Sequence, residues 1–392
     1  MKLLKKIKYY IESGFILEKQ YKKINDSIFF DRKDICKTFY NLLTEEKQDT
    51  IIEPLKNRIP IVICADNNYA PYACTTIKSI KENNRTKREY DFIIFHENIS
   101  AYKQKLIKYL EDGQTSIRFV NIAEHIDNNK LFYSHSYFSK SMYSRFFIPK
   151  IMKNYSKVIY LDCDIIANCD LAELYDFDIK NHAAAAVQDM SLYITSNKRT
   201  EKLKNKLKFD SIDKYFNSGL LLMNIKELNK MQFLKQCIML LLLHKNLDCP
   251  DQDILNMVLK DKVKILPSTY NHLYHLPWNG LYGQMDKVHK EQYLKDHGAP
   301  KIIHYTSRQK PWNYPWNEYA DLWWKYTKEN PFYEEIIYKN LKQGLPDKAF
   351  IEQQIKHSLK RSKTKYRIYK ILARLSFGKY KKRFQNKMEK YR

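Results

Sequence analysis

The feature that most restricts the fold is a series of short apolar runs separated by longer stretches, several of which have helical character. The runs are apolar throughout instead of alternating with polar residues, which is typical of strands buried on both faces of a sheet. Helix-like stretches at 70–81 and 102–111 separate the first runs, and such alternation is typical of α/β proteins. The chain is therefore predicted to form an α/β fold with a mainly parallel sheet. The predicted strands are 59–65, 91–95, 117–120, 158–161, 183–187, 216–223, 263–266 and 301–303.

Polar residues follow several of these runs directly. Asp66 comes after the first run, Asp162 after the fourth, Asp189 after the fifth and His304 after the eighth. Ligands of open α/β sheets bind outside the carboxyl ends of the strands. We therefore expect these four residues to meet at one edge of the sheet and to form a binding site there.

The segment after the fourth run carries two acids, Asp162 and Asp164, separated by Cys163. Alternate side chains of an extended chain point the same way, so both carboxylates can reach one ion. Hard oxygen ligands suit Mg²⁺ or Mn²⁺ and leave positions open for phosphate oxygens. The alternative is that this acidic pair only begins a turn.

The eighth run ends at His304, and Lys310 follows it. An imidazole added to two carboxylates shifts the preference of a site from Mg²⁺ towards Mn²⁺. Lys310 offers a point charge for a pyrophosphate. The alternatives are a histidine that belongs to the core and a lysine that belongs to the surface.

A third group of polar residues lies at 250–256, where a helix is predicted to begin. An amide flanked by carboxylates, Gln252 between Asp251 and Asp253, can hold sugar hydroxyls and face an anomeric carbon. Acids in a first helical turn also act as caps, which is the alternative. The polar residues at 217–219 interrupt the sixth run and indicate a bulge, a close ligand approach or a sheet irregularity.

The turn after the first run contains Asp66, Asn68 and Tyr69. The two polar side chains can read a base and a ribose, and the tyrosine ring can stack on the base. Asn and Asp are equally common in turns and at helix N-caps, so ordinary turn chemistry is the alternative.

Glycine and cysteine usage narrows the class of protein. The chain has eight glycines, none of them in a glycine-rich phosphate loop, so phosphate recognition must use side chains and metal. Its seven cysteines form no paired C-x-x-C units, which favours a reducing compartment over a disulfide framework or a zinc ribbon. No apolar run reaches the roughly 18 residues of a membrane span, so a cytoplasmic protein is expected.

The two ends of the chain differ from its centre. Residues 1–58 are Lys-rich and are predicted to form a helical extension. Residues 331–392 form a basic region, in which 356–392 holds 15 Lys or Arg against one acid, a net charge of +14 of the total +25. The apolar residues of 359–375 fit a basic amphipathic helix, which predicts attachment to an anionic membrane surface. A solvated tail or one held by nucleic acid is the alternative.

Taken together and in this order, the motifs resemble those of the family 8 retaining glycosyltransferases, most of all bacterial lipopolysaccharide and lipooligosaccharide galactosyl- and glucosyltransferases. The resemblance covers about 59–330, which is the predicted catalytic domain. The matching segments are IVICADNNYAPYACTTIKSI, SMYSRFFIPK, KVIYLDCDIIANCDLAELYDFD, YFNSGLLLMNIKEL, PDQDILNMVLKDKV and IIHYTSRQKPWN.

The resemblance implies the A-type glycosyltransferase fold, which is Rossmann-like. It also implies a UDP-sugar donor, a glycan or glycolipid acceptor, and Mn²⁺ as the cofactor, with Mg²⁺ as the alternative. Ser307 is also predicted to bind the UDP-sugar; it departs from the family pattern, which often has a glycine at this place close to the phosphates. By position, the residues that match the family's metal ligands are Asp162, Asp164 and His304. Those that match its uridine contacts are Asp66, Asn68 and Tyr69, and Lys310 matches its pyrophosphate contact. The residues that match those holding the donor sugar or lining the reaction centre are Arg145, Asp189, Asn217, Asp251 and Gln252.

Retention of configuration requires either a protein nucleophile or attack by the acceptor on the face that the leaving group departs from. Gln252 is a poor nucleophile because an amide is far less basic than a carboxylate. Same-face substitution is therefore favoured, with Asp189 as the alternative nucleophile. The basic tail predicts that the enzyme lies at the inner face of the cytoplasmic membrane, where its acceptor would be anchored. No nucleic acid is expected as a partner, because the charge lies mostly outside the motif-bearing region and no known reader motif appears. A glycogenin-like self-glycosylating primer and a basic nucleic-acid-binding protein are the competing functions.

Overall fold

The computed structural model describes residues 51–126, 132, 140–193, 200, 201, 203–205, 209, 211–244, 247–274, 285–306, 309–315, 317–343 and 385. The predicted helices at 1–58 and 359–375 fall almost wholly outside these residues; the described part of the first, 51–57, is not helical. The chain up to 311 together with 315–333 forms one compact unit, and 312–314 with the chain from 334 onwards forms another. The features described below belong to the first unit unless stated.

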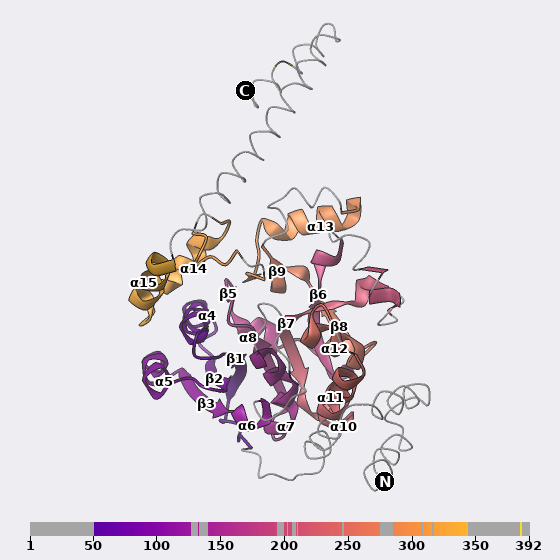
Figure 1. The fold of residues 1–392 in the computed structure, drawn as a ribbon, viewed down its shortest axis with the longest axis horizontal. Helices are drawn as coiled ribbons and strands as arrows, with labels where there is room; N and C mark the ends of the chain where they lie inside the picture. The colour runs from indigo at the N-terminus through magenta and orange to yellow at the C-terminus, as the bar shows by residue number, and fades with distance from the viewer. Residues whose placement is uncertain are drawn as a thin grey trace. The chain divides into compact units, whose positions relative to one another are not determined.

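A central seven-stranded sheet with the order β3-β2-β1-β4-β7-β6-β8 forms the framework of this unit (Figure 1). All neighbouring pairs are parallel except those that involve β7, which runs antiparallel to β4 and β6. The predicted mainly parallel α/β sheet is confirmed. The strands are β1 Arg58–Cys64, β2 Glu89–His96, β3 Thr115–Asn121, β4 Lys157–Leu161, β6 Ala184–Gln188, β7 Phe216–Asn224 and β8 Val263–Leu266.

The reversed direction of β7 places its first residues at the edge where β4 and β6 end. Leu220 pairs with Leu161 at the end of β4, and Phe216 pairs with Gln188 at the end of β6. The pairing register of β6 with β7 shifts from Ala186 to Val187. The sheet irregularity predicted at 217–219 is therefore present, on the part of β7 that faces these two residues. The polar residues at 217–219 therefore lie at the carboxyl edge of their neighbours.

A second, three-stranded sheet corrects one prediction. His304 was expected at the end of a strand of the main sheet, but it ends β10 (Ile302–His304), which lies between β5 (Ile165–Ala167) and β9 (His272–Leu273). Strands of two or three residues carry too few side chains for a sequence pattern to show them. The short apolar run before His304 was consequently assigned to the wrong sheet.

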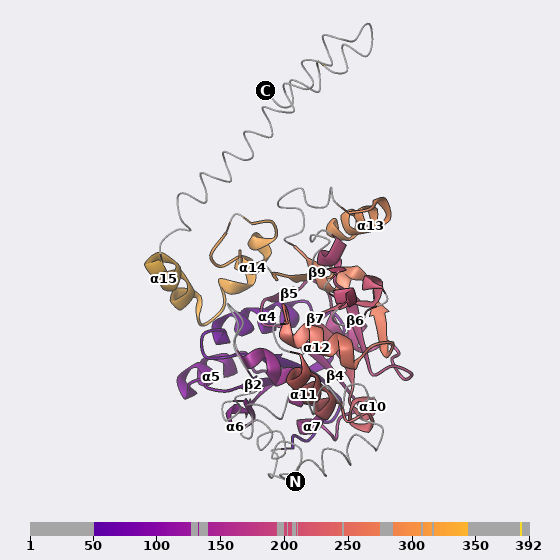
Figure 2. The same cartoon turned by 45° about the vertical axis from the view of Figure 1, so that its right-hand side comes forward.

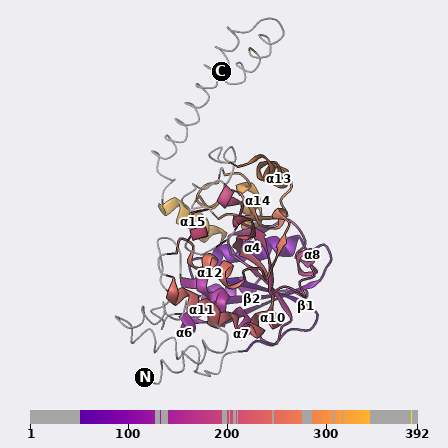
Figure 3. The same ribbon diagram turned by 90° about the vertical axis from the view of Figure 1, so that its right-hand side faces the viewer.

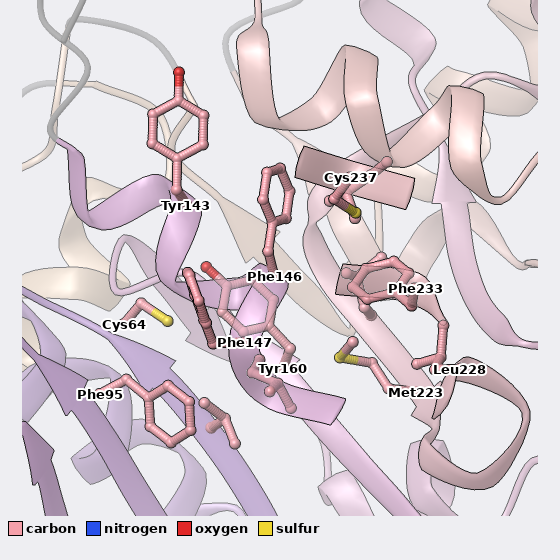
Figure 4. Packing of buried hydrophobic residues seen from close by; sticks show 14 of the residues in the cluster. Cys64, Phe95, Tyr143, Phe146, Phe147, Tyr160, Met223, Leu228, Phe233 and Cys237 are labelled. Carbon is pink, nitrogen blue, oxygen red and sulfur yellow. The ribbon is translucent and has the colours of Figure 1, made fainter. Parts of the chain in front are cut away.

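Helices cover both faces of the main sheet. One face carries η2 (Lys140–Phe147), α7 (Ile148–Ile151), α10 (Ile225–Lys230), α11 (Phe233–Leu243) and α12 (Pro250–Val258). Their apolar side chains form a continuous core with the strands, in which Phe147 and Phe146 lie next to Tyr160 and Phe233 lies near Met223 (Figure 4). Figure 2 shows α11 and α12 side by side in front of the strands, where they contact each other.

The helices predicted at 70–81 and 102–111 are α4 (Ala70–Glu82) and α5 (Ala101–Lys108). Helix α5 contacts α4 and β3, and α8 (Leu171–Tyr175) contacts β4; Figure 3 shows α4 and α8 beside the main sheet. The remaining elements of this unit are α6 Ala123–Ile126, η3 Met190–Tyr193, η4 Ile212–Lys214, η5 Ser268–Asn271, α13 Lys287–His297 and α14 Ala320–Thr327. Helix α15, Tyr333–Gln343, belongs to the second unit from its second residue onwards. Among the described helices, none has the length and apolarity required to cross a bilayer.

Candidate active site

The end of β4 and the end of β10 bring two carboxylates and one imidazole together. Asp162, Asp164 and His304 each offer a ligand atom within 4.8 Å of the others. Nε2 of His304 lies 3.2 Å from Oδ1 of Asp164 and 3.6 Å from Oδ2 of Asp162. The three residues predicted to bind a metal therefore converge, although they come from two different sheets.

Backbone hydrogen bonds hold the strands that carry this cluster. The Asp162 N–H donates to the carbonyl of Gly219 on β7 over 2.8 Å, and the Tyr305 N–H donates to the carbonyl of Asp164 over 3.0 Å. Gly219 is required for the close approach, because a Cβ there would lie 2.1 Å from Cε1 of His304 and 2.9 Å from Oδ2 of Asp162. Any side chain at 219 would displace the histidine.

The cluster fits a divalent cation. Oδ1 of Asp164 is buried and accepts no hydrogen bond from the residues that the structure describes, although it faces Nε2 of His304. A buried carboxylate oxygen without a donor is costly unless a cation completes its surroundings. Two carboxylates and one imidazole are donors that Mn²⁺ accepts readily and that Mg²⁺ tolerates.

Lys310 supplies a fixed positive charge beside this cluster. Its Nζ donates to Oδ2 of Asp164 and to the carbonyl of Tyr305, both over 2.5 Å. Burial alone would raise the pKa of Asp164, but the neighbouring Lys310 ammonium holds that pKa well below its usual value. Asp164 is therefore ionised whenever a cation could bind.

Arg145, from η2, is buried between two acids of the site. Its guanidinium donates to Oδ1 of Asp162 over 2.8 Å and to the carbonyl of Ser218 over 2.9 Å, and it lies 3.1 Å from Oδ2 of Asp251. Burial alone would lower the pKa of the Arg145 guanidinium. The carboxylates of Asp162 and Asp251 and the Tyr160 ring beneath the guanidinium raise that pKa overall. The pKa of Asp251 is raised by its own burial despite the neighbouring Arg145. Arg145 therefore links the metal cluster to the start of α12.

The start of α12 presents Gln252 to the same site. Its Oε1 accepts hydrogen bonds from Ser218 N over 3.0 Å and from Asn217 Nδ2 over 3.1 Å, and its Nε2 donates to Oδ2 of Asp189 over 2.8 Å. The capping alternative is also present, since Asp251 and Asp253 both lie in the first turn of α12 and Oδ2 of Asp253 accepts from the backbone N–H of Cys249 over 3.3 Å.

The turn between β1 and α4 uses Asp66 as a local hydrogen-bond acceptor. Oδ1 of Asp66 accepts from the backbone N–H groups of Asn68, over 2.8 Å, and Tyr69, over 2.9 Å. The turn chemistry that was the alternative is thus present. Asp66 and Tyr69 nevertheless line the pocket, whereas Asn68 is exposed and does not.

One pocket of about 340 Å³ collects most of these groups. Ser307 lies outside the described residues. Sequence reasoning missed Asn271 next to His304, because nothing in its surroundings distinguishes it from an ordinary loop asparagine. The predicted residues that line the pocket are Asp66, Tyr69, Arg145, Asp162, Asp164, Asp189, Asn217, Asp251, Gln252, His304 and Lys310.

Comparison with known proteins gives a consistent result. Residues 60–315 match the protein family described as "Glycosyl transferase family 8". Glycosyltransferase GlyF of Streptococcus pneumoniae is 30% identical over 275 residues, which are 69% of this chain and 61% of GlyF. Lipopolysaccharide 1,2-glucosyltransferase of Escherichia coli K12 is 26% identical over 268 residues, 68% of this chain and 76% of that protein. The chain thus spans about three fifths of GlyF.

Solved structures confirm the predicted A-type glycosyltransferase fold. The bifunctional glycosyltransferase WbbM superposes with a TM-score of 0.65 at 25% identity, over 74% of this chain and 53% of WbbM. The galactosyltransferase LgtC, solved with donor and acceptor sugar analogues, superposes with a TM-score of 0.57 at 23% identity, over 69% of this chain and 96% of LgtC.

Proposed function

The chain belongs to glycosyltransferase family 8, and we propose that within this family it is a retaining hexosyltransferase that uses a UDP-sugar and a divalent cation. The observation that carries the proposal is one pocket that holds a carboxylate–imidazole cluster and a buried Gln252–Asp189 pair. Arg145 connects the two through Ser218, which bonds both Arg145 and Gln252. The first group suits the diphosphate of a nucleotide sugar, and the second suits the sugar.

The diphosphate end of the donor would lie at Asp162, Asp164 and His304, which would hold Mn²⁺ or Mg²⁺. A cation bound there supplies positive charge that stabilises the departing UDP. Lys310 would add a second positive charge, since its Nζ is held beside Asp164 and within reach of the same phosphates. Asp66 and Tyr69, in the same pocket, would contact the uridine. Asn68 stays a proposed ribose contact on the sequence resemblance alone.

The donor sugar would lie against Gln252, Asp189, Asn217 and Asp251. Both oxygens of Asp189 are engaged: Oδ1 accepts from the backbone N–H of Ser191 over 3.0 Å, and Oδ2 accepts from Gln252 Nε2. Each hydrogen bond draws negative charge from the oxygen that accepts it, so both oxygens of Asp189 are weaker nucleophiles than those of a free carboxylate. This arrangement favours same-face substitution, with the Gln252 amide steadying positive charge on the sugar ring.

The acceptor is proposed to be a cell-envelope glycan or glycolipid, as in lipopolysaccharide core synthesis. Support comes from relatives in E. coli that are named for lipopolysaccharide glucosyl transfer. The donor hexose is glucose or galactose. Attachment of the basic C-terminal region to the inner face of the cytoplasmic membrane would bring enzyme and a lipid-linked acceptor to one surface; of that region the structure describes 331–343 and 385.

A donor screen tests the proposal. The purified protein is incubated with Mn²⁺ and each of UDP-glucose, UDP-galactose and UDP-N-acetylglucosamine, and released UDP is measured. UDP release from one hexose donor, lost in EDTA and restored by Mn²⁺, is expected. Equal release in EDTA would contradict the metal assignment, and no release from any UDP-sugar would contradict the donor class.

A further inference from the structure

Asn271, the last residue of η5, links the metal cluster to the sugar end of the pocket. Its Oδ1 lies 2.9 Å from Nδ1 of His304, and its Nδ2 donates to Oδ1 of Asn217 over 2.9 Å. We infer that Asn271 is a positioning residue that keeps the proton of His304 on Nδ1, and that it couples this histidine to Gln252 through Asn217. The inference deepens the proposed function and rests on it for the identity of the donor.

Five side chains form one continuous series of hydrogen bonds. From the metal cluster towards the sugar end, the series runs His304, Asn271, Asn217, Gln252 and Asp189, with separations of 2.9, 2.9, 3.1 and 2.8 Å. All five side chains are at most 8% exposed. Because water has little access to them, each must find its hydrogen-bond partners within the protein.

The direction of this series is set by two backbone donors, which cannot reverse. Gly219 N–H donates to one side-chain atom of Asn217 over 3.0 Å, so that atom must be Oδ1. Ser218 N–H donates to one side-chain atom of Gln252 over 3.0 Å, so that atom must be Oε1. The side-chain amides of Asn217 and Gln252 are therefore fixed in orientation by backbone donors of β7.

The remaining directions follow. Oδ1 of Asn217 is an acceptor, so the Asn271 atom next to it must be the donor Nδ2. The other atom of that amide is then Oδ1, an acceptor, and the group facing it must donate. That group is Nδ1 of His304, which therefore carries a proton.

With its proton on Nδ1, the neutral imidazole has a lone pair on Nε2. This atom faces Asp164 Oδ1 and Asp162 Oδ2, at 3.2 and 3.6 Å. The absence of a hydrogen bond to Asp164 Oδ1, among the described residues, agrees with a lone pair at this place. Metal-binding histidines commonly donate their second ring N–H to an acceptor that fixes ring and tautomer, and here the acceptor is an amide.

The backbone keeps Asn271 in position. Next to it, His272 and Leu273 form β9, which pairs with β10 so that His272 lies opposite Ile303 and Leu273 opposite His304. The His272 ring does not take part in the series. Its Nε2 lies 3.0 Å from Nδ1 of His297 instead. Two strands thus hold Asn271 and His304 side by side.

Two substitutions separate the two links of Asn271. In Asn271→Leu both hydrogen bonds are lost. In Asn271→Asp a carboxylate oxygen still accepts from His304 Nδ1, but the other oxygen faces Asn217 Oδ1 and repels it. Asn330→Leu is the matched control, since Asn330 is equally buried, donates to Pro71 O over 2.9 Å and lies outside the pocket lining.

Three measurements are made on the full chain: Mn²⁺ affinity by electron paramagnetic resonance of free Mn²⁺, ring ¹⁵N shifts of His304 in metal-free protein well above the ordinary imidazole pKa, and UDP-sugar hydrolysis. The His304 signals are assigned by their loss in His304→Gln. We expect Asn271→Leu to weaken Mn²⁺ binding about 10- to 100-fold and to lose the Nδ1-protonated signature. Asn271→Asp should keep the Mn²⁺ affinity within about threefold of the native value and should retain the Nδ1-protonated signature. It should nevertheless lower kcat at least tenfold, because the disturbed Asn217 contacts Gln252.

Native Mn²⁺ affinity and an unchanged His304 tautomer in Asn271→Leu would overturn the inference. If that variant does not fold, Asn271→Asp still decides, because loss of the Nδ1-protonated signature there would overturn it as well. A native protein that hydrolyses no UDP-sugar but shows the expected tautomer and affinity changes would contradict the proposed function and leave the role of Asn271 supported.

Discussion

The α-carbon of Gly219 on β7 lies directly against the imidazole of His304 on β10. A Cβ at 219 would come within 2.1 Å of Cε1 of that ring, far inside van der Waals contact. The two residues belong to different sheets, and their contact is what allows the main sheet to present Asp162 to a histidine from outside it. The metal cluster consequently depends on the lack of a side chain at one position.

Gly219→Ala tests this dependence. The added methyl must push His304 away from the carboxylates, so we expect Mn²⁺ affinity to fall at least tenfold, in the range seen when a ligand is displaced. Gly298→Ala is the control, because a Cβ there would meet its nearest atom at an ordinary 3.6 Å. Calorimetric titration with Mn²⁺ measures both. Native affinity in Gly219→Ala would mean that His304 is not a ligand.

Asp162→Ala and Asp164→Ala are each expected to abolish sugar transfer, with at least a hundredfold loss in kcat/KM, while the fold stays intact. Each substitution removes one hard ligand from a three-residue set. Asp261→Asn, at an exposed position, controls for loss of a carboxylate. Donor hydrolysis and far-UV circular dichroism are the measurements. Full activity in both alanine variants would show that the acids do not hold a catalytic cation.

The sequence predicted the local parts of this site well and their assembly less well. The spacing of Asp162 and Asp164 after a buried strand is a local pattern, and the structure brings both carboxylates together. It does so through a turn at 163–164, which was the alternative, and not through extended chain. The direction of β7 is set by tertiary pairing, so no pattern within it shows that Asn217 lies at the ligand-binding edge. Asn271 shows the same limit, since its role depends on two-residue β9 pairing with β10.

Gln252→Ala is expected to lower kcat about 10- to 100-fold and to leave UDP affinity within about threefold of the native value. The Gln252 amide lies at the proposed sugar end and bonds Asp189 and Ser218, away from the carboxylate–imidazole cluster. Gln236→Ala on α11, whose side chain donates to Met231 O, is the matched control. Kinetics and UDP titration are compared. A variant that loses only UDP affinity would place Gln252 at the nucleotide instead.

The engaged carboxylate of Asp189 makes a prediction about intermediates. We expect no covalent hexosyl adduct on Asp189 when the enzyme is quenched during donor turnover, because hydrogen bonds to both oxygens weaken this carboxylate as a nucleophile. Intact-mass measurement followed by peptide mapping checks this. A mass increase of one hexosyl unit on Asp189 would establish a covalent mechanism. A stable hexosyl unit on a tyrosine would identify a self-glycosylating primer.

The basic C-terminal region carries the prediction about location. Residues 356–392 have a net charge of +14 and apolar residues spaced for a helix. Each Lys or Arg near an anionic surface contributes about 1 kcal/mol, so partial engagement suffices for attachment. Truncation after Leu345 should leave donor hydrolysis within about twofold, since all the pocket residues precede it, while transfer to a lipid-linked acceptor falls.

Sedimentation with vesicles containing phosphatidylserine, compared with neutral phosphatidylcholine vesicles, measures the attachment directly. The full chain should bind the anionic vesicles and lose that binding in high salt, because screening weakens the attraction between lysines and lipid headgroups. Equal sedimentation of the truncated and full chains would show that the region is a solvated tail. The Lys-rich residues 1–58 would then be tested by deletion in the same assay.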